Sequence, residues 1–487
     1  MATSSLKARA RKRTTRGNKR PSEIVANTRK PLWKHQKLTK KLYERTKSVY
    51  DLSDPGTGKT RAHLEAFAER RRQGGGKALV IAPKSLLETA WWADAWEFTK
   101  DMRCSVAYAR NRSAAFNVHA DIYITNTDAV KWLKANLKSK HWDDFDTLIM
   151  DEITDFKHHT SQRSKAAKWL SSFFTYRIGL TGTPNPKSVT EMWHQVLLLD
   201  GGQRLGPSFW NFRSSVQSPK QEGPRPEHVK WYDKEGAEEA VFGLIGDIAI
   251  RHIFEECMDI PPNVERHVQF SLAPKVQKMY KKLEASTVLQ LEQGDVIGLN
   301  AAALRTKLLQ VASGAVYIDE DTYEVLDDTR YELITQLIKE QKHSICFYIW
   351  KHQKDQLIRL AEREGMSYAH LDSTVTRRKD AVKQIVADYQ AGKYQVLYLH
   401  PKTGAHGLTL TRGTRTIWAS PVYQPDFIKQ GKHRIYRGGQ THKTETIMVE
   451  AKQTAERKVF DILNNDGARM LNFLDIVHAA KETYEDD

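Results

Sequence analysis

The segment SDPGTGKT, residues 53–60, has the residue types of a loop that binds phosphate groups. Gly56 and Gly58 permit backbone conformations that turn amide groups toward an anion at the N-terminus of a helix. In such a loop Lys59 would reach the β- and γ-phosphates, and the Thr60 hydroxyl would bind magnesium. Ser53 stands where the usual pattern begins with glycine, so one position departs from it. We predict that the nucleotide is contacted by Gly56, Thr57, Gly58, Lys59 and Thr60.

Two neighbouring carboxylates follow this loop by about 90 residues in the sequence DTLIMDE. Asp151 and Glu152 come at the end of an apolar segment that is typical of a buried strand, and ligands bind at the carboxyl ends of strands in open α/β sheets. Asp151 is predicted to hold magnesium with Thr60, and Glu152 to orient and deprotonate the attacking water. Together with the phosphate loop, the pair predicts an ATPase that uses ATP and Mg²⁺.

Short apolar segments alternate with helical patterns along most of the chain, which predicts parallel sheets built from right-handed βαβ units. Strands are expected near residues 48–53, 77–83, 121–125, 146–152 and 176–184, and a second series near 343–350, 367–372, 394–400, 415–420 and 445–450. Two tandem α/β lobes follow from the two series. We expect a first lobe over residues 31–265, a helical connector over 266–330 and a second lobe over 331–487.

The 487-residue chain carries a net charge of +17, which indicates a polyanionic partner. Residues 1–30 hold ten Lys and Arg against the single acid Glu23. This segment has few large apolar residues, so we predict a disordered basic tail that tethers nucleic acid. The apolar runs are too short for a membrane span and the N-terminus does not resemble a secretion signal, so a cytoplasmic location is expected, in the host if the protein is phage-encoded. Three scattered cysteines indicate neither disulfides nor a zinc module.

The order of these motifs resembles the Swi/Snf branch of superfamily-two helicases over roughly residues 31–465. IAPKSLLETAWWADAWEF, ITNTDAV, LTGTPNPKSVTEMWHQVLLLD, HLDSTVTRR, LHPKTGAHGLTLT and QGKHRIYRGGQ are similar to the motifs of that family. The resemblance implies two RecA-like lobes with a nucleotide cleft between them. It also implies that Gln36 reads adenine and that Gln430 contributes to the nucleotide site.

Further roles are implied by the same resemblance. Arg434 and Arg437, three residues apart, would reach across the cleft to the γ-phosphate, so that hydrolysis requires lobe closure. Residues of the LTGTP motif would couple the ATP state to lobe movement, namely Thr181, Gly182 and Thr183. Nucleic-acid contacts would come from Lys84, Ser85, Thr125, Asn126, Thr403, Gly404 and Thr409.

The sequence departs from the family pattern at a few positions. Ile153 and Thr154 follow the carboxylate pair in place of the usual Ala-His or Ala-Asp, and Thr409 replaces an Asn. Trp91, Trp92 and Trp96 have helical spacing and are expected to pack within the lobe rather than stack on bases. His158, His159 and His433 do not form a recognisable metal motif.

The resemblance implies a DNA-dependent ATPase that acts as a motor and translocates on double-stranded DNA in replication, recombination or repair. Single-stranded or branched DNA is a further possible partner, and the motor is expected to be monomeric. A strand-separating DNA or RNA helicase shares the same ATPase core and stays an alternative, as does a phage-type packaging ATPase. A nucleotide-switched DNA-binding or annealing factor is the alternative from another class.

Overall fold

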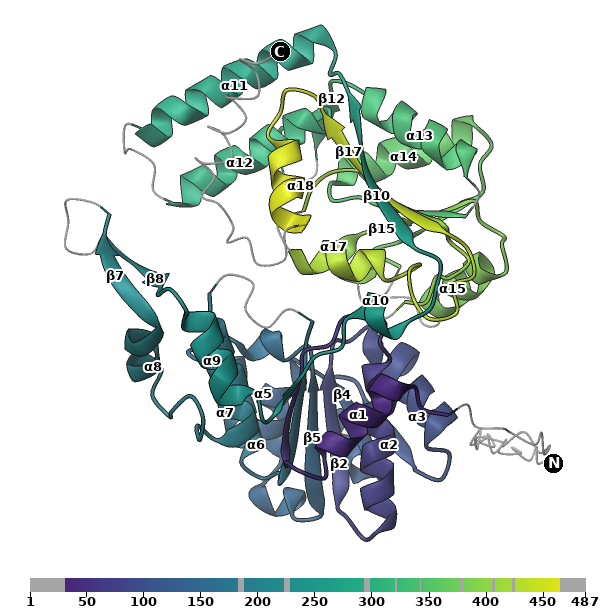
Figure 1. The fold of residues 1–487 in the computed structure, drawn as a ribbon. Coiled ribbons are helices and arrows are strands. Elements are labelled where there is room, and N and C mark those ends of the chain that lie inside the picture. The colour runs from purple at the N-terminus through teal and green to yellow at the C-terminus, as the bar shows by residue number, and fades with distance from the viewer. Residues whose placement is uncertain are drawn as a thin grey trace, which may run out of the picture. The chain divides into compact units, whose positions relative to one another are not determined.

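The computed structural model describes residues 31–182, 188–222, 228–292, 298–319, 322–341, 343–375, 381–404, 408–422 and 425–464. The predicted basic tail, residues 1–30, and the coupling residue Thr183 lie outside these ranges. Residues from Trp33 onward form one compact unit. Two parallel sheets organise this unit, which confirms the tandem α/β lobes predicted from the sequence (Figure 1).

The first sheet has the strand order β3-β4-β2-β5-β6-β1-β9, with every pairing parallel. Its strands are β1 (Ser48–Asp51), β2 (Lys77–Ala82), β3 (Cys104–Ala107), β4 (Ile122–Asn126), β5 (Phe145–Asp151), β6 (Tyr176–Leu180) and β9 (Ala249–Ile250). Alternate residues of β2 enter different cores: Leu79 and Ile81 join one cluster, and Ala78 and Val80 join another. Both faces of this sheet are therefore buried, as expected for a parallel sheet.

Helical segments connect these strands and cover the two faces of the sheet. They are α1 (Lys34–Leu42), α2 (Lys59–Arg72), the π-helix η1 (Leu87–Trp92), α3 (Ala93–Phe98), α4 (Arg112–Asn117), α5 (Ala129–Asn136), the 3₁₀ segments η2 (Ser139–Trp142) and η3 (Ile153–Phe156), α6 (Gln162–Ser171), α7 (Glu191–Asp200), α8 (Phe209–Val216), α9 (Ala237–Ile245) and α10 (Phe254–Cys257). A separate antiparallel hairpin is formed by β7 (Gln217–Gln221) and β8 (Val229–Asp233).

The second sheet has the order β10-β17-β16-β13-β15-β14 and is also parallel. Its strands are β10 (Asn263–Phe270), β13 (Ser344–Phe347), β14 (Tyr368–Leu371), β15 (Val396–Leu399), β16 (Arg415–Trp418) and β17 (Thr444–Ala451). The accompanying helices are α11 (Pro274–Glu292), α12 (Gly298–Ala312), α13 (Thr329–Glu340), α14 (Lys351–Arg363), α15 (Ala381–Gln390), α16 (Pro401–Gly404), α17 (Pro425–Lys432) and α18 (Glu456–Asn464), and β11 (Ala315–Tyr317) pairs with β12 (Tyr323–Val325).

The segment 266–330, expected to be a helical connector, is part of the second lobe. Strand β10 pairs with β17 along its whole length, from Asn263 to Phe270. Tyr280 of α11 and Val311 of α12 share a core with Ile334 of α13. The second lobe therefore begins near residue 263 rather than 331. The strand was not predicted from the sequence NVERHVQF because it lies at the edge of the sheet and is half-exposed. Its polar residues interrupt the apolar pattern that is typical of a buried strand.

A buried arginine joins the supposed connector to the rest of the second lobe. Arg330, at the start of α13, donates hydrogen bonds to the carbonyls of Ala312 (2.8 Å), Ala419 (2.5 Å) and Val449 (3.0 Å). Its guanidinium also pairs with Glu456 at 2.6 Å, and both side chains are buried. One side chain thus links α12, the end of β16, β17 and α18.

Replacement of Arg330 by Ala should destabilise the second lobe by about 3–5 kcal/mol, because Glu456 would be left as an unpaired buried charge. The matched control is Arg359→Ala, which removes an exposed ion pair with Asp328 and should cost about 0–1 kcal/mol. Chemical denaturation of both variants measures the difference. Equal stabilities of the two variants would contradict the role given to Arg330.

Candidate active site

The phosphate loop lies between β1 and α2 and adopts the conformation that its glycines permit. Gly56 and Gly58 have φ values of 88° and 75°, in the left-handed region that favours glycine, and Gly58 caps the N-terminus of α2. A Cβ on Gly58 would lie 2.4 Å from Nε2 of Gln36, and one on Gly56 would lie 2.9 Å from the Phe254 ring. Both positions therefore require glycine for backbone conformation and for space.

The Lys59 side chain folds back onto the phosphate loop. Its ammonium donates to the backbone carbonyls of Ser53 at 2.5 Å and Asp54 at 3.3 Å. Thr57 is buried, and its hydroxyl donates to the same Asp54 carbonyl at 2.9 Å. Thr60 is half-buried in the first turn of α2. The cation and the helix N-terminus thus lie together, as the binding of an anionic phosphate chain requires.

Helix α1 contacts the loop through polar side chains. Gln36 donates from Nε2 to the Gly58 carbonyl at 3.1 Å, and the backbone N–H of Trp33 donates to Oε1 of Gln36 at 3.0 Å. His35 lies 2.7 Å from the Thr57 carbonyl through Nε2. No sequence motif singled out His35, which is buried. The predicted adenine-reading role of Gln36 stays a prediction, and its position beside the loop is consistent with it.

Asp151 and Glu152 lie at the carboxyl end of β5, on the same edge of the sheet as the phosphate loop. Asp151 accepts hydrogen bonds from the Trp91 indole at 2.8 Å and from the Glu152 backbone N–H at 3.1 Å. Burial raises the pKa of Asp151, although the Trp91 hydrogen bond and the Lys59 charge act in the opposite direction. Glu152 has a φ of 53°, a strained conformation of the kind that occurs at functional sites.

A buried chain of side chains supports the loop from behind. Oδ1 of Asp51 accepts from the Ser53 N–H at 2.9 Å, and Oδ2 lies 2.9 Å from Nε2 of His63. Nδ1 of His63 in turn lies 2.6 Å from the Tyr43 hydroxyl. Burial would raise the pKa of Asp51, but the hydrogen bond and charge of His63 and the charge of Lys59 lower it to about 2. No motif spacing identified these three residues, because their pairing depends on the tertiary fold.

The predicted coupling residues follow β6, between β5 and β1 in the sheet. Thr181 is buried, and its N–H donates to the Asp51 carbonyl at 3.0 Å. A Cβ on Gly182 would lie 3.3 Å from Pro55 of the phosphate loop. Ile153, which replaces the usual Ala of the family pattern, packs against Gly179 of β6. A Cβ on Gly179 would lie 2.5 Å from Cδ1 of Ile153. Glycine in β6 thus makes room for the larger side chain after the carboxylate pair.

Residues of the second lobe contact the edge that carries the phosphate loop. Gln430 donates from Nε2 to Oε1 of Glu152 at 3.2 Å, and Lys429 forms an ion pair with Asp54 at 2.8 Å. Elsewhere along the lobe boundary, Lys383 forms an ion pair with Glu88. The sequence-predicted residue Gln430 therefore lies against the sequence-predicted base.

Arg434 and Arg437 lie beside this contact. Both donate to the Leu408 carbonyl at 3.2 Å, and Arg434 also donates to the Gln430 carbonyl at 2.8 Å. Burial and the Arg437 charge lower the pKa of Arg434 to about 9, although the Glu152 charge acts in the opposite direction. The Cβ of Arg437 lies 3.6 Å from the position a Cβ would take on Gly56. The buried cation Arg434 and the partly buried cation Arg437 thus lie near the loop, where a phosphate chain would bring negative charge.

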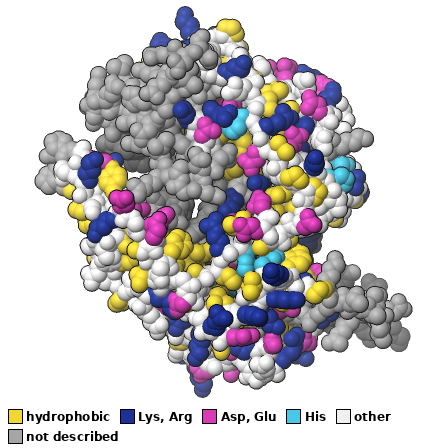
Figure 2. All heavy atoms as spheres, viewed as in Figure 1, with side chains coloured by type: hydrophobic (Ala, Val, Ile, Leu, Met, Phe, Trp, Pro, Cys, Tyr) yellow, Lys and Arg dark blue, Asp and Glu magenta, His cyan; other side chains and the backbone are white. Residues whose placement is uncertain are grey.

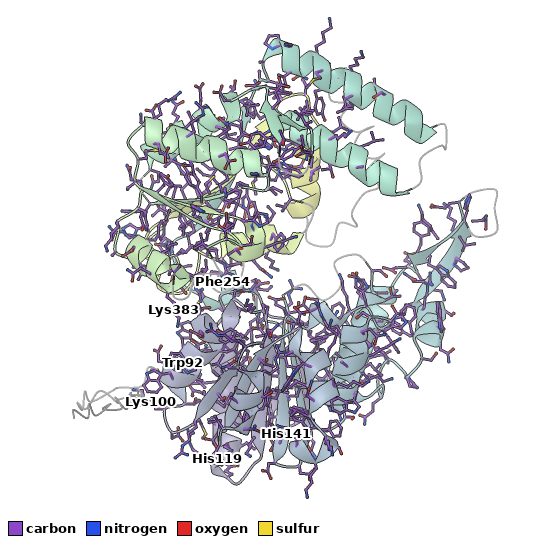
Figure 3. The ribbon with its side chains drawn as sticks, turned by 180° about the vertical axis from the view of Figure 1, so that it is seen from behind. Trp92, Lys100, His119, His141, Phe254 and Lys383 are labelled. Atoms are coloured by element: carbon purple, nitrogen blue, oxygen red, sulfur yellow. The ribbon has the colours of Figure 1, made fainter. Side chains whose placement is uncertain are left out.

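Phe254, in the segment between the two sheets, packs at the same junction (Figure 3). Its N–H donates to Oδ2 of Asp54 at 3.1 Å. Its ring meets His433 and Tyr436 edge-on, with centroids 4.7 Å and 5.0 Å away. No motif marks this residue, because HIFEEC resembles an ordinary loop and short helix.

The seven residues predicted to contact nucleic acid differ in their accessibility. Lys84 and Thr409 are exposed, and partly buried positions are taken by Ser85, Asn126 and Thr403. Thr125 is fully buried and its hydroxyl donates to the Ala107 carbonyl at 2.9 Å, so its side chain is not available to a ligand here. Gly404 is also buried, and a Cβ on it would lie 2.8 Å from Leu399. Packing within the lobe therefore explains Thr125 and Gly404 better than a nucleic-acid contact does.

The tryptophans expected to pack within the lobe behave differently from one another. Trp91 is buried beneath the site, whereas Trp92 and Trp96 are exposed and stack on each other with centroids 5.9 Å apart. Figure 3 places Trp92 at the surface of the first lobe. The expectation is therefore confirmed for Trp91 and wrong for the other two.

Basic side chains are concentrated on one visible face. Figure 2 shows Lys and Arg gathered over the region where Figure 1 places α1 and α2.

Within the described ranges, no cluster of three His, Cys, Asp or Glu is arranged to hold a metal ion, and no helix has the length and apolarity to cross a membrane.

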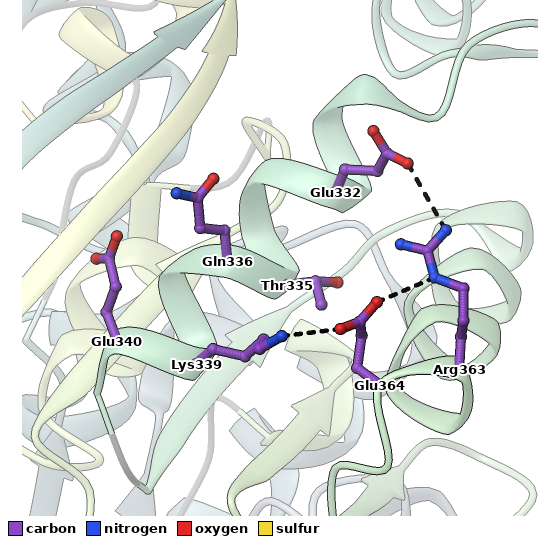
Figure 4. Close-up of a pocket in the computed structure, with 7 residues that line it drawn as sticks. All are labelled: Glu332, Thr335, Gln336, Lys339, Glu340, Arg363 and Glu364. Atoms are coloured by element: carbon purple, nitrogen blue, oxygen red, sulfur yellow. Dashed lines mark hydrogen bonds and ion pairs between the residues drawn. The ribbon is translucent and has the colours of Figure 1, made fainter.

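A surface hollow between α13 and α14 lies on the second lobe (Figure 4). Four of its charged lining residues pair with one another: Glu364 accepts from Lys339 at 2.8 Å and from Arg363 at 3.1 Å, and Glu332 lies 3.7 Å from Arg363. The fifth, Glu340, lies 3.6 Å from Arg415, which is outside the lining. None of the residues of the ATP site lines this hollow.

Comparison with known proteins agrees with this geometry. The model of the SNF2-related domain matches residues 16–312, which is more than half of the chain. Putative protein p41 of Acyrthosiphon pisum secondary endosymbiont phage 1 is 26% identical, with 85% of this chain and 91% of that protein aligned. An uncharacterized ATP-dependent helicase of Mycoplasma genitalium is 20% identical over 80% of this chain and 36% of its own length. The DNA annealing helicase and endonuclease ZRANB3 of Mus musculus is 25% identical over 66% of this chain and 29% of its own length.

The chain thus spans nearly all of the phage protein but only about a third of each of the two helicases. The family model covers the phosphate loop, the carboxylate pair and the coupling residues. The chain therefore belongs to the SNF2-related family of helicase-like ATPases.

Proposed function

We propose that this ATPase is stimulated by DNA and translocates along double-stranded DNA without separating its strands. The observation that carries the proposal is the 3.2 Å contact between Gln430 of the second lobe and Glu152 of the first. Glu152, which acts on ATP in this proposal, thereby contacts α17 of the second lobe, so movement of that lobe would change the surroundings of Glu152. The similarity to the mouse DNA annealing helicase and endonuclease supports DNA as the polymer.

In the proposed reaction, Lys59 leaves the loop carbonyls and neutralises the β- and γ-phosphates of ATP. Glu152 orients a water molecule for in-line attack on the γ-phosphorus and accepts its proton. Arg434 and Arg437 stabilise the negative charge that develops on the transferred phosphoryl group, and the bond to the β-phosphate oxygen breaks to give ADP and phosphate.

Magnesium fits the oxygen donors at this site. Carboxylate and hydroxyl oxygens are the ligand types that Mg²⁺ prefers, and the carboxylate of Asp151 is already oriented by Trp91. Asp151 and Thr60 would hold the ion, which would offset phosphate charge. Arrival of a cation would also offset the effect of burial on the pKa of Asp151 and favour its ionised form.

Exposed Lys84 and Thr409 are the predicted contacts that remain open to a DNA backbone. Backbone contacts fix position without reading sequence, which suits a stepping motor. A strand-separating helicase would use the same ATP site and differ in how it treats the two strands, so the two functions are distinguished by product rather than by turnover. A nucleotide-switched binding factor would bind DNA without its turnover being stimulated.

Glu152→Gln should bind ATP and fail to hydrolyse it, because the amide cannot accept the proton from water. The substitution preserves size and an oxygen that can accept from Gln430. Phosphate release and binding of a fluorescent ATP analogue measure the two properties separately. Turnover within about twofold of the parent protein would remove Glu152 from the proposed role.

Arg437→Ala should lower turnover by about three to five orders of magnitude, as loss of an arginine finger does in other NTPases. Arg437→Lys should recover only a small part, because lysine lacks the planar fork that binds phosphate oxygens. A thermal melt of each variant tests whether the fold persists. A folded Arg437→Ala variant with normal turnover would contradict a cross-lobe role for this residue.

The proposal predicts ATP-dependent displacement of a triplex-forming third strand from duplex DNA. The same preparation should leave a tailed duplex annealed, since movement without a separating step does not expose single strands. Gel separation of labelled strands measures both. Separation of the tailed duplex without triplex displacement would assign the protein to the helicase alternative.

A further inference from the structure

The β7–β8 hairpin is unusual among the elements of the first lobe because most of it is exposed. Gln217 pairs with Asp233 at its base and Gln221 with Val229 toward its tip. Figure 1 shows the hairpin extending from the neighbourhood of α8 and α9, away from the central sheet. An isolated two-stranded hairpin is only marginally stable in water, so contacts with the rest of the lobe must stabilise this one.

Aromatic rings and cations gather on this hairpin and on α8. The guanidinium of Arg213 lies 4.2 Å from the centroid of the Trp231 ring and 5.8 Å from that of Trp210. Trp210 is 65% exposed and Tyr232 is 39% exposed. Lys220 and Lys230 are exposed on the paired strands, and Lys230 contacts Glu222 at 2.5 Å. Because successive strand residues point to opposite faces, Trp210 and Arg213 lie on the side of Trp231, and Tyr232 lies with Lys220 and Lys230 on the other side. Each face therefore presents an exposed aromatic ring beside positive charge.

The base of the hairpin is fixed to the segment that follows the coupling residues. Asp233 accepts from the Ser188 hydroxyl at 2.8 Å and from the Val189 N–H at 3.3 Å. Gln217 donates to the same Ser188 hydroxyl at 2.9 Å and to Asp233 at 2.8 Å. Ser188 comes six residues after Gly182, which lies against the phosphate loop. The hairpin is therefore anchored close in sequence to the ATP site.

The chemistry of this surface favours unpaired nucleotides over a protein strand. Pro219 pairs opposite Trp231 and lacks the N–H that an added β-strand would need, so extension of this edge by a peptide is disfavoured. Exposed aromatic faces stack on bases of any sequence, and adjacent cations contact the phosphate backbone. The net charge of +17 of the chain is complementary to the same polyanion.

We propose that α8 and the β7–β8 hairpin bind unpaired nucleotides where a duplex meets single-stranded DNA, with Trp210 and Tyr232 stacking on bases. The inference rests on the proposed function, which it deepens by naming the DNA structure on which the motor is loaded. Binding at a junction holds strands that are already apart and does not require the motor to separate them.

The test uses the full chain with Trp210 and Tyr232 both replaced by Ala. The control is Trp96→Ala, which removes another exposed tryptophan, 59% accessible, from a different part of the first lobe. Fluorescence anisotropy measures binding to a forked duplex and to a blunt duplex of equal length. ATP turnover is measured with the blunt duplex.

The double variant should bind the fork about 5- to 100-fold more weakly, from the loss of base stacking, and should bind the blunt duplex as the parent does. Its turnover on blunt duplex should be unchanged, and the control should bind both DNAs normally. Unchanged fork binding, or equal losses on fork and blunt duplex, would overturn the inference. Absence of DNA-stimulated turnover in the parent protein would instead count against the proposed function, while the fork-binding comparison would still decide the role of the hairpin.

Discussion

Glu152, the proposed base for ATP hydrolysis, lies in the first lobe and is contacted by a residue of the second lobe. The Gln430 amide contacts its carboxylate, and the backbone of Glu152 is held in the left-handed region directly after β5. The same residue begins the turn into η3, so its position depends on the central strands of the first sheet and on α17 of the second. A movement of either lobe therefore changes the surroundings of the group that would activate water.

The burial of ionisable side chains is the second constraint on this site. Burial lowers the pKa of Arg434 and raises that of Asp151, so both residues are less favourable as ions than they would be in water. Phosphate oxygens would favour the charged arginine, and a cation would favour the charged carboxylate. Binding of a phosphate chain and of a cation would therefore favour the charged forms of both residues, and this effect would link substrate binding to lobe contact.

Much of the site could be predicted from sequence because its motifs are local. The glycines, Lys59 and the carboxylate pair lie at strand ends, and parallel strand order brings those ends to one edge. The residues that were missed, such as Tyr43, His63 and Phe254, act through contacts between distant segments. Strand β10 was missed because an edge strand exposes polar side chains, and the motif around Thr125 did not reveal that its hydroxyl donates to the Ala107 carbonyl within the sheet. Pairings of this kind are set by tertiary packing and leave little local signal.

The central claim is that DNA contact promotes a lobe arrangement competent for hydrolysis, and the rate of ATP turnover at saturating ATP tests it most directly. We would measure this rate without polymer and with equal concentrations of duplex DNA, single-stranded DNA and RNA. The account predicts that duplex DNA raises the rate at least about tenfold, which corresponds to about 1.4 kcal/mol of transition-state stabilisation, and that RNA does not. A rate that is the same with and without duplex DNA would contradict it.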